Sequence, residues 1–327
     1  MERKIVMVVD PIKQGLSKID ITRNDLEGNT ANQTTRLISS LEKIAPVRCY
    51  YSVADFEEHI NDHLNDIVFP MYYGSAGLTG KGIVPILCET HGIPYIGGDA
   101  YTQIVCNDKA LSKQYAANFG IPSPHGCLFR SEKTNPITVK KLRGLKLPLV
   151  VKPNFGGGST GISKNNIVNS YKEAEELARV LFHHIGVPIL VEEYIEGYEV
   201  ELIVVGTKKE IRFCDEVQLI MDGADYFQRD IWGFETKRVN DDSIEFKSSA
   251  HISANNRQQL LDLFQSFEKA EAVRFDGRVY NGQFYLLEIS PDCYLGDDCA
   301  FYFAFQKNGF THQQMLQFLI NNSLIPY

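Results

Sequence analysis

The first hundred residues alternate short apolar segments with helical ones, and this alternation is the strongest constraint on the fold. Apolar strands are expected at residues 5–9, 47–51, 67–71 and 94–96, and helices at 30–43 and 82–90. Strands that alternate with helices pair in parallel, because each crossover helix returns the chain to the same end of the sheet. The segment therefore predicts an α/β fold, with a parallel sheet covered on both faces.

The rest of the chain predicts further elements, several with local signals at their ends. Ser170 with Glu173 predicts a helix capping box, as does Thr311 with Gln314. Asn281-Gly282 predicts a tight hairpin turn. Helices are expected at 108–119, 171–184 and 253–270, and strands at 147–152, 188–193, 200–206, 211–218, 273–280 and 284–289.

Composition narrows the class of protein. A chain of 327 residues with 44% hydrophobic content suits a globular protein of two or three domains. The net charge of -8 argues against a general nucleic-acid binder, and no apolar run is long enough to predict a membrane span. The N-terminal apolar run ends at Asp10, which is too short for a secretory signal. Seven cysteines without a C-x-x-C pair predict reduced thiols in a cytoplasmic protein.

The stretch VVKPNFGGGSTGISK, residues 150–164, fits neither familiar glycine motif. A P-loop has a lysine directly after its second glycine, where this chain has Ile162. A dinucleotide site opens a helix, whereas residues 162–167 are expected to be extended. Lys152 precedes the glycines instead, on an apolar strand. Two readings stay open: a hairpin loop that covers a phosphate chain, or an ordinary flexible hairpin loop.

Asp276 and Glu288 lie on the two arms of the predicted hairpin. Paired strands can bring both carboxylates to one face, where hard oxygen ligands suit Mg²⁺, although two solvated carboxylates are the alternative. Glu288 follows the apolar residues 285–287, where burial without a partner would be costly, so a metal or cation is expected. Residues 222–249 are polar and aperiodic, which predicts a lid.

In their order along the chain, these motifs resemble the ATP-grasp superfamily and, within it, the D-alanine-D-alanine ligase branch. The matching segments are GIPYIGG (92–98), NDK (107–109), VVKP (150–153) with the glycine stretch, VEEYIEGYE (191–199), RFD (274–276) and LLE (286–288). The resemblance implies an ATP-grasp fold, which is α+β, behind an N-terminal Rossmann-like domain at 1–103. A central subdomain at 104–193 would carry the glycine loop, and a C-terminal subdomain at 194–327 would carry the metal site and the lid.

The resemblance also implies how ATP is bound. Its contacts would be Lys109 and Lys152 at the phosphates, Gly157, Gly158, Ser159 and Thr160 over them, Glu192, Glu193, Tyr194 and Ile195 at the adenine, and Glu199 at the ribose. The metal, Mg²⁺ with Mn²⁺ as an alternative, would bind Asp276 and Glu288, with Ser290 or Asp292 completing the site. Arg274 would contact the transferred phosphoryl group. Two further catalytic candidates come from the chain itself and not from the resemblance: Lys237 on the predicted lid and Lys81 at the substrate.

The chain departs from this branch at the positions that hold the substrates. Ser290 stands where the metal motif normally ends in asparagine, Gly80-Lys81-Gly82 replaces Glu-Asp-Gly, and Gly158 replaces a serine. Residues 291–299 do not match the segment that receives the second D-alanine. We therefore expect a ligase that joins a larger, anionic carboxylate substrate to an amino-acid-sized amine.

Two other functions stay open, a true D-alanine-D-alanine ligase and an inactive nucleotide-binding protein. The expected partners are small-molecule substrates, not nucleic acid or membrane. Because the branch is commonly dimeric, the resemblance also implies a homodimer.

Overall fold

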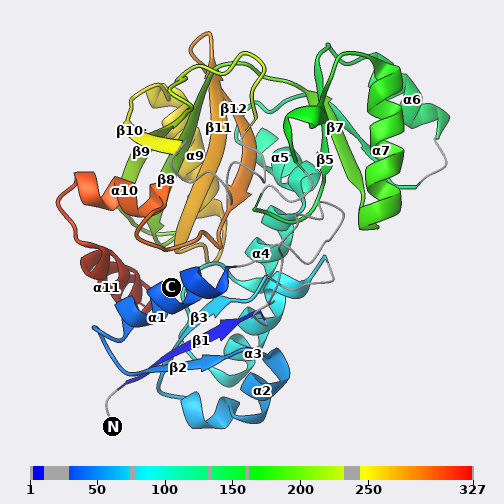
Figure 1. Cartoon of the computed structure of the whole chain (residues 1–327). Helices are drawn as coiled ribbons and strands as arrows, with labels where there is room; N and C mark the ends of the chain where they lie inside the picture. Colours follow the sequence, from blue (N-terminus) through cyan, green and yellow to red (C-terminus); the bar gives the residue numbers. More distant parts are fainter. Residues whose placement is uncertain are drawn as a thin grey trace.

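The computed structural model describes residues 3–10, 29–73, 78–131, 135–158, 162–231 and 244–325. These residues form three sheets, one in the lower part of Figure 1 and two side by side in its upper part. Each of the predicted ranges 1–103, 104–193 and 194–327 contains one sheet, and the boundaries themselves stay a prediction. Within the described ranges, no helix is long and apolar enough to cross a membrane.

The first sheet is parallel, as predicted, in the order β2-β1-β3. Its strands are β1 (Ile5–Val9), β2 (Val47–Tyr50) and β3 (Ile67–Met71). Successive side chains of β1 are buried in two different cores. One core includes α1 (Ala31–Leu41) and α11 (His312–Ser323), and the other includes α2 (Val53–Glu58) and α3 (Ile83–His91). Both faces are therefore covered. Residues 94–96 form only an isolated bridge from Tyr95 to Val68, not a fourth strand.

The second sheet is antiparallel, in the order β4-β7-β5-β6. Its strands are β4 (Gly126–Phe129), β5 (Leu149–Pro153), β6 (Ile167–Val168) and β7 (Ile189–Glu193), covered by α6 (Pro136–Arg143) and α7 (Tyr171–Ile185). Ser170 caps α7, but Glu173 accepts from the Asn169 N–H, so only half of the predicted capping box forms. The expected extended chain at 162–167 is also wrong, because Ser163 and Asn166 cap a short 3-10 helix at Lys164–Asn166.

The third sheet is antiparallel, in the order β10-β9-β8-β11-β12. Its strands are β8 (Tyr198–Gly206), β9 (Ile211–Met221), β10 (Ile244–Ser248), β11 (Ala272–Tyr280) and β12 (Gln283–Ser290). Asn281 and Gly282 have φ angles of 49° and 76°, which confirms the predicted tight turn. Because β10 pairs with β9, one end of the predicted lid 222–249 is an edge strand, and residues 232–243 lie outside the described ranges.

Four further α-helices lie in the described ranges. They are α4 (Ala100–Asn107), α5 (Lys109–Ala117), α9 (Ala254–Ser266) and α10 (Ala300–Lys307). The predicted helix 253–270 ends early because Phe267 is extended, and α4, α6 and α10 were not predicted. Side chains of α10 and α11 share one core with the first and third sheets, whereas α4 and α5 contact β12. These contacts bring the end of β12 to the centre of the molecule (Figure 1).

Candidate active site

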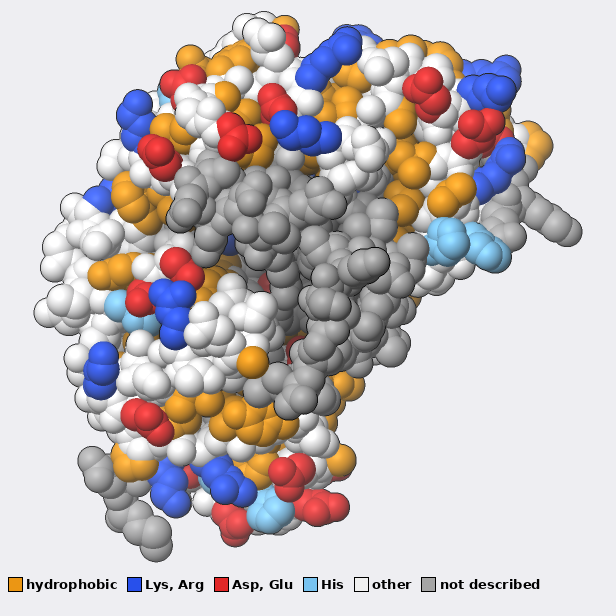
Figure 2. All heavy atoms as spheres, in the orientation of Figure 1, with side chains coloured by type: hydrophobic (Ala, Val, Ile, Leu, Met, Phe, Trp, Pro, Cys, Tyr) orange, Lys and Arg blue, Asp and Glu red, His pale blue; other side chains and the backbone are white. Residues whose placement is uncertain are grey.

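Two cavities lie between the sheets. The smaller, of about 100 Å³, is lined by residues of the second and third sheets. The larger, of about 640 Å³, is lined by residues of α1, α4, β12 and the chain that follows β12. Glu288 lines both cavities, so they meet near the end of β12. On the face that Figure 2 shows, Lys and Arg side chains are intermixed with Asp and Glu.

The Asn107-Asp108-Lys109 motif anchors the start of the glycine loop. Asn154, just after β5, donates from Nδ2 to the Asp108 carboxylate (2.8 Å), and its carbonyl accepts from the Lys109 N–H (3.0 Å). The Gly156 N–H donates to Asn107 Oδ1 (3.0 Å). Two motifs far apart in the sequence therefore form one structural unit, which fixes the direction in which the loop leaves β5.

The described part of the loop has the conformation that its glycines allow. Gly156 and Gly158 have φ angles of 84° and 64°, which other residues adopt only with strain. Gly157 and Gly158 line the larger cavity. Ser159 and Thr160 lie outside the described residues.

A buried carboxylate, Glu192, holds two lysines at the end of the smaller cavity. Its Oε1 is 2.5 Å from Lys152 Nζ, and its Oε2 pairs with Lys113 Nζ. Burial alone would raise the pKa of Glu192, but the two lysines lower it below its ordinary value. Burial lowers the pKa of Lys113 to about 8, despite the nearby Glu192. Lys152, predicted to bind phosphate, is thus held in an ion pair with Glu192.

The predicted adenine and ribose residues line the same cavity. Glu193, Tyr194, Ile195 and Glu199 are all among its walls. Arg278 joins them: it donates to the Ile195 carbonyl (2.7 Å) and, through Nε and Nη2, to Glu199 Oε2 (3.0 and 2.8 Å). Both side-chain bonds end on Oε2, so Oε1 can still accept from a ribose hydroxyl.

The predicted metal residues share one face of the third sheet. Asp276 lies opposite Glu288, and Arg274 lies opposite Ser290, across β11 and β12. Residues two apart on a strand point to the same side, so the four side chains lie together. A β-bulge makes Leu287 the extra residue of β12, and both Leu287 and Glu288 line the smaller cavity.

Each of these carboxylates is paired with a cation of the chain. Arg274 donates to both oxygens of Asp276 (2.6 and 2.7 Å), and Lys109 Nζ is 3.2 Å from Glu288 Oε1. Burial would lower the pKa of Arg274, but Asp276 and Glu201 raise it well above the ordinary value. The partly buried oxygen donors fit a hard divalent cation, which would bind where these positive groups now lie.

Lys81 pairs with Asp292, which the sequence analysis offered as a metal ligand. Its ammonium is 2.8 Å from Asp292 Oδ2, and both side chains line the larger cavity. The sequence predicted a positive charge facing an anionic substrate, with Asp292 available to the metal. In the structure the two charges compensate each other, and Ser290 is the residue that shares the face of Asp276 and Glu288. Lys237 lies outside the described residues.

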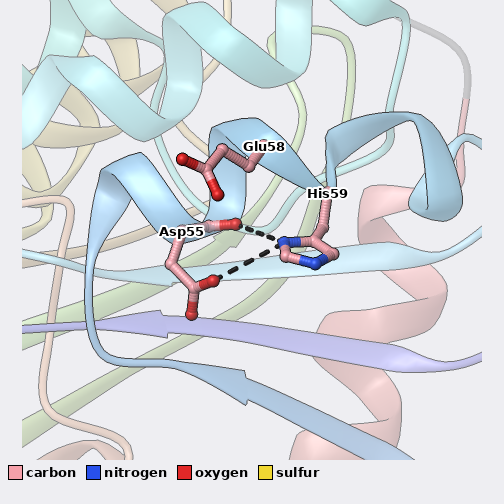
Figure 3. Close-up of side chains that lie close together, drawn as sticks. All are labelled: Asp55, Glu58 and His59. Carbon is pink, nitrogen blue, oxygen red and sulfur yellow. Dashed lines mark hydrogen bonds and ion pairs between the residues drawn. The ribbon is translucent and has the colours of Figure 1, made fainter.

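A separate cluster of possible metal ligands lies on α2, which packs on the first sheet. Figure 3 shows Asp55, Glu58 and His59 on one turn, with His59 Nδ1 bonded to the Asp55 carbonyl (2.8 Å) and 3.5 Å from its carboxylate. All three lie in or directly after α2, away from both cavities, and Asp55 and Glu58 are exposed. These contacts are typical of a solvated helix end, so we do not consider the cluster a candidate site.

Sequence reasoning missed several residues that line or support the cavities, among them Lys113, Arg278, Gln103 and Arg36. Two had a usable signal. Lys113 follows Lys109 by one helical turn, and Arg278 follows Arg274 and Asp276 in strand alternation. Arg36, which pairs with Asp297 and Asp298, and Gln103 have no such local signal.

Comparisons with known proteins find a matching family and related sequences. The family described as "D-ala D-ala ligase C-terminus" matches residues 116–321, more than half of the chain. A D-alanine–D-alanine ligase of Caldicellulosiruptor bescii is 30% identical over 64% of this chain and 56% of its own length. The chain thus spans little more than half the length of that relative.

Solved structures extend the similarity over the whole chain. The D-alanine–D-alanine ligase of Bacillus anthracis, complexed with ATP, has a TM-score of 0.72 at 19% identity and covers 98% of this chain and 97% of its own. The VanG D-Ala:D-Ser ligase of Enterococcus faecalis has a TM-score of 0.70 at 17% identity and covers 99% and 100%. These identities establish a shared fold alone. Together with the family match, they show that the chain belongs to the D-Ala-D-Ala ligase C-terminal domain family and has the ATP-grasp fold.

Proposed function

We propose that the protein is an ATP-dependent carboxylate-amine ligase that forms an amide bond through an acylphosphate and releases ADP and phosphate. The observation that carries the proposal is the cross-strand pair of Asp276 and Glu288, with Arg274 on the same face and Lys109 and Lys152 beside it. Phosphoryl transfer depends mainly on positioning and on neutralising charge, and this cluster offers both.

Each residue has a role in that chemistry. Lys109 and Lys152 exchange their carboxylate partners for phosphate oxygens, and Arg274 contacts the group in transfer. Asp276 and Glu288, with Ser290, would hold Mg²⁺, which neutralises phosphate charge when it is bound. The substrate carboxylate attacks the γ-phosphorus, ADP leaves, and the amine then attacks the activated carbonyl and displaces phosphate. No residue of the chain has to form a covalent intermediate.

The larger cavity would hold the carboxylate and amine substrates. D-alanine fits the family match as well as another substrate does, so a true D-alanine-D-alanine ligase is the second candidate. We favour a different substrate because Lys81, Gly158 and Ser290 replace the residues typical of that branch. We also propose a cytoplasmic location, in keeping with the seven free cysteines. We propose a homodimer as well, because Ile86 and Tyr101 are exposed on the neighbouring helices α3 and α4.

Release of ADP with Mg-ATP tests the proposal. We expect turnover that requires both an acid and an amine, and loss of that turnover in Glu288→Gln. Product mass then decides between the candidates, because efficient D-alanyl-D-alanine synthesis would establish the ordinary ligase. Nucleotide binding without turnover on a broad panel of acids and amines would favour the inactive nucleotide-binding protein.

A further inference from the structure

A short segment, residues 94–99, carries the chain from the first sheet to the third. Tyr95 forms an isolated parallel bridge with Val68 of β3. Gly98, further along the segment, forms an antiparallel bridge with Ala270, just before β11. One stretch of backbone therefore links both sheets, and we call residues 94–99 the junction.

A buried ion pair from the chain before β11 holds the junction. Lys269 and Glu271 pair with each other, and their side chains are 14% and 1% exposed. Lys269 Nζ donates to the Tyr95 carbonyl (3.0 Å) and lies 4.3 Å from the centre of the Tyr95 ring. Glu271 Oε2 accepts from the Gly97 N–H (3.1 Å). Both charged groups therefore bind the junction as well as each other.

These contacts are suited to fix a position. Apolar side chains of similar volume often stabilise a buried site as well as an ion pair does. Hydrogen bonds, in contrast, require a particular distance and direction, and those of Lys269 and Glu271 end on main-chain atoms of the junction. Gly97 also has a φ angle of 102°, which favours glycine, so the backbone follows a specific path at this point.

The junction leads directly into α4, which lies between the lower sheet and the two upper sheets in Figure 1. The Asp99 side chain accepts from the Thr102 N–H (2.7 Å) and so caps this helix. Part of the wall of the larger cavity comes from α4, with Gln103, Cys106 and Asn107. A Cβ atom added at Gly98 would lie 3.3 Å from Pro291 Cβ, so the junction also packs on the chain after β12. A shift of the junction would therefore move α4 relative to the end of β12.

The two cavities depend on the junction differently. Of the described residues, those that line the smaller cavity come from Lys109 onward, so the first sheet takes no part in it. The larger cavity combines Tyr73 and Lys81, which follow the first sheet along the chain, with residues of β11 and β12. A displaced junction should therefore disturb the alignment of substrates with ATP more than the binding of ATP itself.

We propose that Glu271, through its pair with Lys269, is a positioning residue that keeps the substrates in the larger cavity aligned with the phosphoryl group of ATP. Glu271 lines neither cavity, so it acts through the junction. This inference rests on the proposed ligase function.

Misalignment has a chemical consequence in that reaction. A displaced amine leaves the acylphosphate to water. The water oxygen attacks the carbonyl carbon, the bond from that carbon to the phosphate oxygen breaks, and the free acid and phosphate leave with one proton released to solvent. ADP is then formed without the amide.

The ratio of amide formed to ADP released tests this role. Both are measured with Mg-ATP and an acid and amine that the unmodified protein joins, where the two amounts should be equal. In Lys269→Met/Glu271→Leu, apolar side chains replace the ion pair. We expect amide formation to fall about 10- to 100-fold, since a displacement of about 1 Å can cost that much. Release of ADP should fall less, and the Kd for a non-hydrolysable ATP analogue should be unchanged.

Further variants separate positioning from folding. A partly unfolded protein loses amide and ADP in proportion, so the ratio responds to alignment and not to the folded fraction. Glu271→Gln keeps the side-chain volume without the charge and should also lower the ratio, whereas Lys269→Arg keeps the pair and should retain most of it. The control makes the same replacements in a nearby, more exposed pair, as Lys208→Met/Glu268→Leu. Thermal melting checks that each variant folds.

Several outcomes would overturn the inference. One is a ratio like that of the control in Glu271 variants that fold. Another is a loss of amide and ADP at a constant ratio, or an equal loss of ATP affinity, either of which would give the ion pair a general structural role. Unfolding of both Glu271 variants would do the same. If the unmodified protein forms no amide from any acid and amine, the proposed function fails, and this inference fails with it.

Discussion

Replacing Lys113 by methionine should weaken ATP binding, although we expect no contact between Lys113 and ATP. Glu192 is 2% exposed and is paired with both Lys113 and Lys152. When Lys152 turns to a phosphate, Lys113 keeps the Glu192 carboxylate compensated. In Lys113→Met, Lys152 is the one of these two lysines that still pairs with Glu192. Moving Lys152 to a phosphate then leaves the buried Glu192 carboxylate as an unpaired charge, which is costly.

The size of the effect follows from the contact that is lost. A hydrogen bond to a charged group contributes about 1.5–3 kcal/mol, and about 1.4 kcal/mol is a factor of ten in a binding constant. The Kd for a non-hydrolysable ATP analogue should therefore rise about 10- to 100-fold by calorimetry. Lys113→Arg keeps the positive charge and should lose much less affinity for the analogue. The control is Lys172→Met, because the Lys172 side chain is 86% exposed, and this variant should bind the analogue normally.

The same lysine predicts a pH dependence. Since burial lowers the pKa of Lys113 to about 8, the ammonium is charged below that pH and neutral above it. ATP affinity should fall as the pH rises through about 8, and Lys113→Arg should remove this change. The effect on folding has the opposite sign. Between about pH 8 and the ordinary lysine pKa of 10.5, Lys113 is more protonated in the unfolded chain than in the folded one. Its contribution therefore makes the free energy of unfolding rise with pH over that range.

Two results would refute this reasoning. One is unchanged ATP affinity in Lys113→Met, with a melting temperature like that of the unmodified protein. The other is a pH dependence near 8 that persists in Lys113→Arg.

Four further predictions concern the rest of the site. Lys152→Ala should weaken nucleotide binding severely in calorimetry, and unchanged affinity would remove its phosphate role. Glu288→Gln should keep the melting temperature but lose Mg-ATP turnover, and substantial remaining turnover would exclude Glu288 as a metal ligand. Amide exchange in Ile244–Ser248 should slow when an ATP analogue binds, and equal rates with and without it would contradict a lid there. Ile86→Glu should shift sedimentation toward the monomer if the exposed apolar surface of α3 joins two copies, whereas an unchanged state would place any dimer contact elsewhere.

The sequence by itself determined many of the local elements, including the two strands that carry the candidate metal ligands, although α4, α6 and α10 were not predicted. Apolar runs of strand length predicted β1 and β3 with their observed bounds, and Asn281-Gly282 predicted the turn that sets the register of the last hairpin. The register set by that turn alone would place Asp276 opposite Leu287, and the β-bulge at Leu287 shifts it so that Asp276 lies opposite Glu288 on one face. The strand and turn predictions worked because each depends on residues that are close along the chain.

Only the tertiary structure decided which charges compensate one another. Lys113 pairs with Glu192, and Lys81 pairs with Asp292, because packing brings together α5, β7, the 3-10 helix Gly80–Gly82 and the end of β12. A sequence shows that a lysine is present, but whether it faces water, a substrate or a buried carboxylate depends on elements far away in the chain. That is why the sequence indicated an anionic substrate from Lys81, whereas in the folded protein Lys81 forms an ion pair with Asp292.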